Sequence, residues 1–140
     1  MIATIIFFVV YLFSLGVIIS VGFIKQRSKE NNYKSASEKI TASEITVLIP
    51  FRNEENRIYG LLNSINALET QVKEFIFIND HSDDSSVYTI QNRLEIENYS
   101  ILDLPDGVTG KKKALRYASK KINSKYTLTI DADVEMEPSF

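Results

Sequence analysis

The chain has 140 residues, among them 16 Lys and Arg, 18 Asp and Glu, one His, and neither Cys nor Trp. With 44% apolar and 24% charged residues, it is not collagen-like, disulfide-stapled or wholly disordered. The absence of cysteine also excludes a Cys-ligated zinc and a thiol nucleophile. From residue 45 onward there are 11 basic and 15 acidic residues. Because non-specific nucleic-acid binding needs a broad basic surface, we expect no nucleic-acid partner.

The first 24 residues carry no charge. A helix of this length rises about 36 Å, enough to cross a hydrocarbon core about 30 Å thick. Cations follow this run directly, at Lys25, Arg27 and Lys29, and none precedes it, as expected of an uncleaved anchor with its following residues in the cytoplasm. A cleaved signal peptide and a buried soluble helix are the alternatives. The sequence thus predicts one transmembrane helix over residues 1–24, a polar juxtamembrane linker over residues 25–44, and a cytoplasmic soluble domain.

From residue 45 onward, short apolar runs alternate with segments of helical periodicity. The predicted strands are residues 45–49, 74–78, 99–104 and 126–130. Pro50 should end the first strand, Asn53 should cap the first helix, and Gly110 should open the last helix. This alternation predicts an α/β fold, a Rossmann-like and mostly parallel sheet with helices on both faces. Residues 45–140 are few for a doubly wound domain, so we expect the domain to be incomplete.

Polar clusters follow three of the four predicted strands, at residues 50–55, 79–84 and 131–133. In an open α/β sheet ligands bind at the carboxyl ends of the strands, so we expect the three clusters to meet at one edge. Asp131 and Asp133 can both approach one hard cation, or one can bind the cation and the other a sugar hydroxyl. Such oxygen ligands suit Mg²⁺ or Mn²⁺. The alternative is a solvated acidic turn.

Asp80 directly follows the second predicted strand, where its carboxylate can accept hydrogen bonds from a base or a ribose. Asp83 and Asp84, a few residues later, are expected to cap the next helix. The sole histidine, His81, lies between these acids. We expect it to make an ordinary polar contact rather than to act as a general base.

Gly110 is followed by three lysines at a predicted helix start. Free backbone amides at such a position attract anions, and cations beside them would help to bind a diphosphate. The run is not a Walker A loop, because the leading glycine and the hydroxyl residue after the lysine are missing. Lys111 and Lys113 are the lysines that we expect to contact the anion.

The segments VLIPFRNEE, FINDHSDDSS, GKKKALRYA and LTIDAD occur in this order and at a characteristic spacing. Together they resemble the nucleotide-sugar half of family-2 glycosyltransferases of the GT-A fold, and the resemblance covers residues 45–140. It implies a nucleotide-diphosphate sugar as donor, a UDP-sugar in the first place, with a divalent cation and inversion at the anomeric carbon. Combined with the predicted membrane anchor, it suggests a lipid-linked or saccharide acceptor near the bilayer.

The resemblance also implies roles for residues in the first two motifs. Pro50, Asn53 and Glu54 match the first-strand motif that lines the nucleotide pocket, and Asp80 matches the acid that contacts the base. The second motif of the family usually reads Asp-Asp-Gly-Ser, whereas residues 79–82 read Asn-Asp-His-Ser. This chain therefore has histidine where the family usually has glycine.

In the remaining motifs, Lys111 and Lys113 match a segment that contacts the donor. The Asp-X-Asp motif places Asp131 toward the ribose and Asp133 toward the metal and the diphosphate. The carboxylate that activates the acceptor hydroxyl lies later in the family's sequences, so we expect it beyond Phe140 and assign it to no residue here.

Two other functions are compatible with an α/β nucleotide site. A sugar-phosphate nucleotidyltransferase would want a glycine-rich phosphate loop after the first strand, and residues 50–55 contain no glycine. A non-catalytic, membrane-anchored nucleotide-binding fragment is the other alternative. Binding of UDP that depends on Mn²⁺ and on Asp133 would favour the glycosyltransferase.

Overall fold

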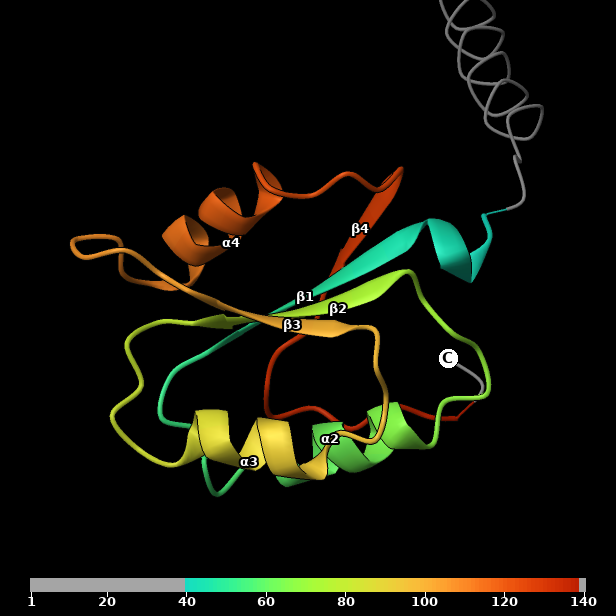
Figure 1. The fold of residues 1–140 in the computed structure, drawn as a ribbon, viewed down its shortest axis with the longest axis horizontal. Coiled ribbons are helices and arrows are strands. Elements are labelled where there is room, and N and C mark those ends of the chain that lie inside the picture. Colours follow the sequence, from blue (N-terminus) through green and yellow to red (C-terminus); the bar gives the residue numbers. More distant parts are fainter. Residues whose placement is uncertain (1–39, 139–140) are drawn as a thin grey trace, which may run out of the picture. The chain divides into compact units, whose positions relative to one another are not determined.

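The computed structural model describes residues 40–138, in which four strands and three α-helices alternate along the chain (Figure 1). In order, the elements are η1 (Ala42–Glu44), β1 (Ile45–Phe51), α2 (Tyr59–Asn66), β2 (Glu74–Asn79), α3 (Ser86–Arg93), β3 (Tyr99–Asp103), α4 (Lys111–Ser119) and β4 (Tyr126–Thr129). The predicted order of strands and helices is confirmed, and every strand ends within two residues of its predicted end.

The strands form one parallel sheet in the order β3-β2-β1-β4. β1 lies in its interior, where Leu48 is opposite Ile76 of β2 on one side and Thr129 of β4 on the other. β2 then pairs with β3, also in parallel. Because all four strands run in the same direction, the segments that follow them leave from the same edge of the sheet.

Helices cover both faces of the sheet, α4 on one face and α2 and α3 on the other (Figure 1). Successive side chains of β1 alternate between the two faces: Val47 and Ile49 pack in the cluster beneath α2 and α3, and Leu48 packs in the cluster beneath α4. Phe77 of β2 is fully buried and meets Tyr99 of β3 edge to face, with 6.3 Å between the ring centroids. The predicted two-sided α/β architecture is confirmed.

Pro50 does not end β1, as predicted, but lies within it, opposite Ile78 of β2. A proline lacks the amide that a sheet ladder uses, so it must face a side without a partner. The Leu48 carbonyl accepts a hydrogen bond from the Ile130 amide on the β4 side, and Pro50, two residues later, faces that same side. β4 ends at Thr129, so the missing amide removes no hydrogen bond from the ladder.

The prediction that Asn53 caps the first helix is wrong. α2 begins at Tyr59, its N-cap is Ile58, and residues 55–58 form turns before it. Asn53 instead has a left-handed backbone, with φ of 54°, a conformation that Asn tolerates better than most residues. Its side chain is engaged by the loop after β2, so it is not available to cap a helix.

The transmembrane helix predicted over residues 1–24 lies outside the described residues, as does most of the predicted linker. Among residues 40–138, no helix is both long and apolar enough to cross a bilayer. The last residues of the predicted linker form η1.

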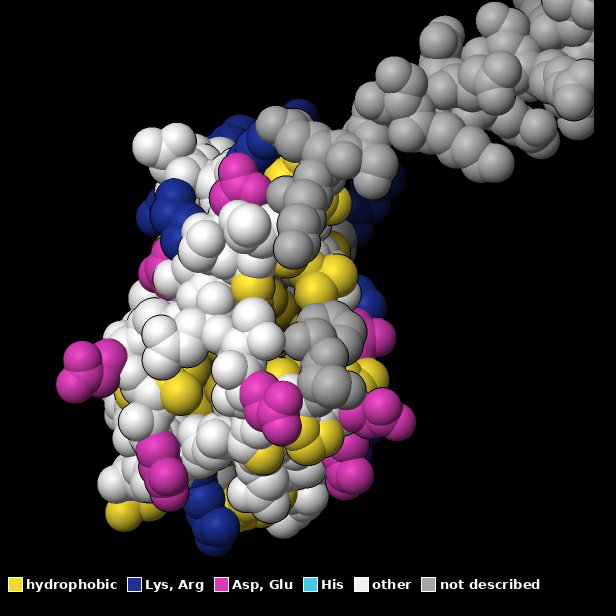
Figure 2. All heavy atoms as spheres, turned by 90° about the vertical axis from the view of Figure 1, so that its right-hand side faces the viewer, with side chains coloured by type: hydrophobic (Ala, Val, Ile, Leu, Met, Phe, Trp, Pro, Cys, Tyr) yellow, Lys and Arg dark blue, Asp and Glu magenta, His cyan; other side chains and the backbone are white. Residues whose placement is uncertain are grey.

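Figure 2 shows the face at the amino ends of the strands, where basic side chains gather mainly toward the α4 side and acidic ones lie over much of the rest. The predicted site lies at the opposite edge.

Candidate functional site

A cavity of about 290 Å³ opens at the carboxyl edge of the sheet. The segments after β1, β2 and β4 contribute to it, together with the start of α4. Its lining residues are Pro50, Phe51, Arg52, Glu54, Asp80, Lys111, Ala114, Asp131, Ala132 and Asp133. The structure thus brings together residues from all four sequence motifs, although they lie up to 83 positions apart.

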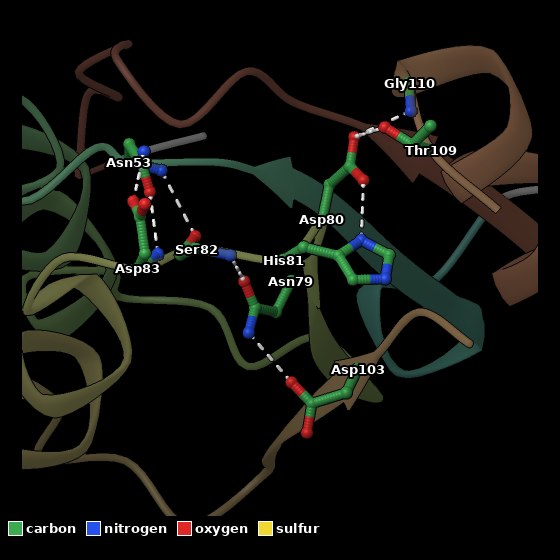
Figure 3. A network of polar contacts seen from close by, with 9 residues as sticks. All are labelled: Asn53, Asn79, Asp80, His81, Ser82, Asp83, Asp103, Thr109 and Gly110. Carbon is green, nitrogen blue, oxygen red and sulfur yellow. Dashed lines mark hydrogen bonds and ion pairs between the residues drawn. The ribbon is translucent and has the colours of Figure 1, made fainter. Parts of the chain in front are cut away.

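Two of the predicted site residues do not line this cavity. Lys113 is exposed on the first turn of α4, two residues beyond Lys111, which does line it. Asn53 lies next to the lining residue Glu54, but its side chain is directed to Asp83 in the neighbouring loop (Figure 3). The donor contacts that the resemblance implies for Asn53 and Lys113 remain predictions.

Asp80 is the most deeply buried carboxylate of the cavity, with only 7% of the residue exposed. Its Oδ2 accepts hydrogen bonds from the Gly110 amide (2.6 Å) and the Thr109 hydroxyl (3.3 Å), and Nδ1 of His81 lies 3.2 Å from Oδ1 (Figure 3). Burial raises the pKa of Asp80, but these hydrogen bonds and the charge of Arg52 together hold it below its ordinary value of 3.8. The carboxylate therefore ties the end of β2 to the start of α4.

The loop after β1 is fastened to the loop after β2 by direct hydrogen bonds. Nδ2 of Asn53 donates to Oδ1 of Asp83 (2.6 Å), and Oδ1 of Asn53 accepts from the Asp83 amide (3.0 Å) (Figure 3). The Asn53 amide also donates to the Ser82 hydroxyl (3.1 Å). This reciprocal pair holds the two loops that carry Glu54 and Asp80 in register.

A second set of bonds continues this contact toward α3. The Glu54 amide donates to the hydroxyl of the fully buried Ser86 (2.8 Å), and the Glu55 amide donates to Oδ2 of Asp84 (3.0 Å). Oδ1 of Asp84 accepts from the amide of Ser86, the first residue of α3. The N-cap of α3 is Ser85, which follows Asp84, so the predicted cap is displaced by one residue, although Asp84 still accepts a hydrogen bond from the first amide of the helix. Asp83 pairs with Asn53 instead.

The two acids of the Asp-X-Asp motif flank the buried Ala132, and each is about half exposed. Asp131 forms an ion pair with Nζ of Lys111, at the first turn of α4. Asp133 has Nη1 of Arg57 at 3.9 Å from its Oδ2. Both carboxylates therefore point at a basic side chain that comes from another part of the fold.

Sequence reasoning missed two basic residues near the cavity. Arg52 lines it, and Arg57 reaches Asp133 from the turn before α2. The only signal for Arg57 is its spacing of three residues from Glu54, which favours a pair between them. Nothing in the sequence indicates the approach to Asp133, which is 76 positions away.

A larger cavity of about 690 Å³ lies beside the first and shares Lys111 and Asp131 with it. Its other lining residues are Leu128, Thr129, Ile130, Val134, Glu135, Met136 and Glu137. They come from the end of β4 and from the segment that follows the Asp-X-Asp motif, and they are mainly apolar with two acids among them. A volume of this size is typical of ligand pockets.

The profile of the family described as "Glycosyl transferase family 2" matches residues 46–140. The chain belongs to this family. The resemblance found in the four sequence motifs is confirmed, and the match includes all three α-helices, the four strands except the first residue of β1, and the residues that line both cavities.

A known synthase and a solved crystal structure are among the proteins similar to this family-2 chain. Poly-beta-1,6-N-acetyl-D-glucosamine synthase of Staphylococcus epidermidis is 29% identical over 115 residues, which are 82% of this chain and 28% of that protein. The crystal structure of S. aureus TarS 1–349 in complex with UDP-GlcNAc matches with a TM-score of 0.57 and 25% identity over 67% of this chain and 28% of that one. This chain spans less than a third of either protein's length.

A more distant structure shows the fold alone. Mannosyltransferase PcManGT from Pyrobaculum calidifontis, in complex with GDP-Man and Mn²⁺, matches with a TM-score of 0.57 at 16% identity. The match covers 80% of this chain and 35% of that one. The similarity to these structures shows that the fold is GT-A-like, as the resemblance implied.

The departure from the usual family-2 motif at residues 79–82 is accommodated locally. His81 has a φ of 58°, in the left-handed region that glycine adopts most readily. Oδ1 of Asn79 accepts from the Ser82 amide (2.9 Å), and Nδ2 of Asn79 donates to Oδ1 of Asp103 (2.8 Å) (Figure 3). These bonds hold the turn in a glycine-like shape although the residue at its centre is histidine.

The left-handed backbone of His81 leads to a prediction about the stability of the chain. His81→Gly should be tolerated, because glycine relieves the strain and offsets the lost contact with Asp80. His81→Val should lower the free energy of unfolding by about 1–3 kcal/mol, because a β-branched side chain disfavours this backbone. Urea unfolding followed by circular dichroism measures both variants, and equal stability of the two would contradict the strain.

The acids present fit a divalent cation that shares its ligands with a substrate. Within residues 40–138, no group of three or more His, Cys, Asp and Glu side chains is placed to hold a metal ion. Mg²⁺ and similar cations commonly use one or two carboxylates and complete their shell with phosphate oxygens and water. Asp131 and Asp133, half exposed at the cavity, supply two such carboxylates. The residues therefore fit a cation that binds together with a diphosphate.

Proposed function

We propose that residues 45–140 form the donor-binding part of a glycosyltransferase. In this proposal the chain binds a nucleotide-diphosphate sugar, a UDP-sugar in the first place, and a divalent cation. The sugar is transferred with inversion to a lipid-linked or saccharide acceptor. The observation that carries the proposal is that Asp80, Lys111, Asp131 and Asp133 line one cavity at the carboxyl edge of the sheet. The UDP-GlcNAc complex of TarS and the polymer named in the synthase relative support a UDP-sugar as donor.

Asp80 is assigned to the base of the nucleotide. A carboxylate offers about four acceptor positions, and Gly110, Thr109 and His81 already approach those of Asp80. Capacity for one further donor, such as the N–H of a uracil ring, remains. Because the pKa of Asp80 lies below its ordinary value, the group stays ionised and acts as an acceptor only.

The diphosphate of the donor is assigned to the part of the cavity that Lys111, Asp131 and Asp133 line, and not to the part beside Asp80. Asp133 and Asp131 would hold the cation, which when bound supplies Lewis-acid stabilisation of the diphosphate leaving group. Lys111 adds a positive charge at the start of α4, where free backbone amides also favour an anion. Asp131 already forms an ion pair with Lys111, which keeps the lysine near the diphosphate. The base that activates the acceptor hydroxyl is assigned to no described residue.

Calorimetric titration of UDP, with and without Mn²⁺, tests this assignment. We expect Mn²⁺ to strengthen UDP binding to the 140-residue chain and Asp133→Ala to lower the affinity in Mn²⁺ by about tenfold or more, since the main cation ligand is lost. Glu97→Ala removes an exposed carboxylate that lines neither cavity and should leave binding unchanged. Unaltered affinity in Asp133→Ala would contradict the assignment of this residue. Binding of UTP in preference to UDP would favour a nucleotidyltransferase.

The membrane anchor is also part of the proposal. Residues 1–24 are uncharged, and three cations follow within five residues, a pattern that favours a spanning helix with the catalytic part in the cytoplasm. Deletion of residues 1–24 should move the chain from the membrane fraction to the soluble fraction of its host cell. The full chain should resist extraction by alkaline carbonate, and its release by carbonate would contradict a spanning segment.

A further inference from the structure

Three charged side chains, Glu54, Arg57 and Asp133, lie next to one another at the smaller cavity. Glu54 and Asp133 both line the cavity, and Arg57 lies between their carboxylates. The first two are separated by 79 positions in the sequence and come from the ends of two neighbouring strands, β1 and β4. Arg57 therefore bridges two segments that both line the cavity.

Glu54 holds the guanidinium group of Arg57 at two points. Nη2 of Arg57 donates to Oε1 of Glu54 (2.9 Å), and Nε lies 2.8 Å from Oε2. Oε2 is buried and accepts no hydrogen bond of good geometry, so the nearby Nε stabilises it by charge. Only 17% of the Glu54 side chain is exposed. Two contacts with one carboxylate orient the planar guanidinium group, while most of the Arg57 side chain stays exposed.

The remaining nitrogen of Arg57 is directed to Asp133. Nη1 lies 3.9 Å from Oδ2 of Asp133, and the two side chains are 61% and 52% exposed. An exposed pair at this distance contributes little to stability. The position of the charge is therefore more important than the strength of the pair, because it lies beside the carboxylate that we assign to the cation.

We propose that Arg57 is a diphosphate-binding residue of the donor site that pairs with Asp133 when no cation is bound. The proposal rests on the proposed function, since it takes Asp133 as the cation ligand. A guanidinium that Glu54 orients beside Asp133 repels a divalent cation and attracts the negative oxygens of a diphosphate. Its planar fork also matches phosphate geometry better than an ammonium group does.

The charge of Arg57 should weaken the binding of the cation and strengthen the binding of the diphosphate. Damage to the fold would instead change both affinities in the same direction. Arg57→Met keeps most of the stem and removes the charge. We expect it to raise the affinity for Mn²⁺ alone by about threefold to tenfold and to lower the affinity for UDP without metal by about threefold. A general loosening of the site would lower both affinities. Both changes should shrink at high salt, because exposed charges are screened.

The experiment measures Mn²⁺ binding by electron paramagnetic resonance and UDP binding in EDTA by calorimetry, on the full 140-residue chain. Arg93→Met, at the end of α3, removes the same charge away from the cavity and is the matched control. Arg57→Lys keeps the charge without the fork and should lie closer to the wild type in Mn²⁺ affinity. Thermal unfolding of each variant shows that it is folded.

The outcomes distinguish this proposal from the proposed function. Opposite changes in the two affinities of Arg57→Met, absent from Arg93→Met, support the role of Arg57. If wild type binds Mn²⁺ through Asp133 and both affinities of Arg57→Met are unchanged or fall together, the role of Arg57 is wrong while the proposed function stands. A wild-type chain that binds neither Mn²⁺ nor UDP contradicts the proposed function and this role with it.

Discussion

Asp80→Asn is expected to lower the free energy of unfolding by about 2 kcal/mol, because it removes a buried charge that accepts hydrogen bonds from three neighbours. The substitution keeps the shape of the side chain but replaces one accepting oxygen by an amide that donates. If that amide faces Gly110, it opposes the backbone N–H and the contact is lost; if it faces His81, Nδ1 of the imidazole must accept instead of donate. We also expect UDP affinity to fall by about tenfold, since the same carboxylate is assigned to the base.

Urea unfolding and calorimetry on the same preparations check both parts of this prediction. Asp106→Asn is the matched control, because Asp106 is exposed and lines neither cavity. We expect that variant to stay within about 0.5 kcal/mol of the wild type. If the Asp80 and Asp106 variants were equally stable, the carboxylate would not be the link between β2 and α4 that the structure indicates.

The lowered pKa of Asp80 also leads to a prediction of how the stability of the chain depends on pH. The pKa of Asp80 is lowered in the folded chain from its ordinary value of 3.8, so below that value the unfolded chain binds more protons than the folded one. The stabilisation is complete above pH 3.8 and is lost as the pH falls through the folded-state pKa. Asp84, whose pKa is also lowered, acts in the same direction. Asp80→Asn should therefore lose less stability on acidification than the wild type.

Gly110→Ala is the second substitution with a large expected effect. Gly110 has φ of 94° and ψ of 144°, close to a region that only glycine populates. A Cβ atom here would meet nothing within 4 Å, so the strain comes from the backbone alone. We expect a loss of about 2 kcal/mol. UDP affinity should fall several-fold, because relief of the strain moves the amide that binds Asp80 and the start of α4 with Lys111.

Gly107→Ala is a close control for this substitution. Gly107 also has a positive φ, 80°, and open space around its Cβ position, but it lies in the turn before α4 and does not line the cavity. We expect it to lower stability without changing UDP affinity. A loss of UDP affinity in Gly107→Ala as large as that in Gly110→Ala would show that the effect on binding is not specific to the Asp80–Gly110 contact.

The fold was predictable because its elements follow local patterns. Strands such as Glu74–Asn79 are short continuous apolar runs, as expected of parallel strands buried on both faces, and helices such as Lys111–Ser119 carry apolar residues at helical spacing. The convergence of Asp80 and Asp133 was predictable too, because the carboxyl ends of parallel strands share an edge. Pro50 was misjudged because the sequence does not show that β4 ends before reaching it.

The remaining parts of the site depend on side-chain pairs between distant loops. Asn53 fits the pattern of a helix cap, and only the position of Asp83, 30 residues later, shows that it pairs across loops instead. The approach of Arg57 to Asp133 likewise follows from how the β1 and β4 ends sit side by side. Periodicity and propensity describe neighbours along the chain, so they carry no information about such contacts.

Paramagnetic relaxation by Mn²⁺ in the presence of UDP tests the central claim most directly, measured by NMR on the isotope-labelled 140-residue chain. We expect the amide signals of Asp131, Ala132 and Asp133 to broaden most, followed by those of Gly110 and Lys111. Signals from the amino edge of the sheet, such as that of Asn98 just before β3, should stay sharp. Broadening centred at the amino edge, or spread evenly over both edges, would contradict a nucleotide site at the carboxyl ends of the strands.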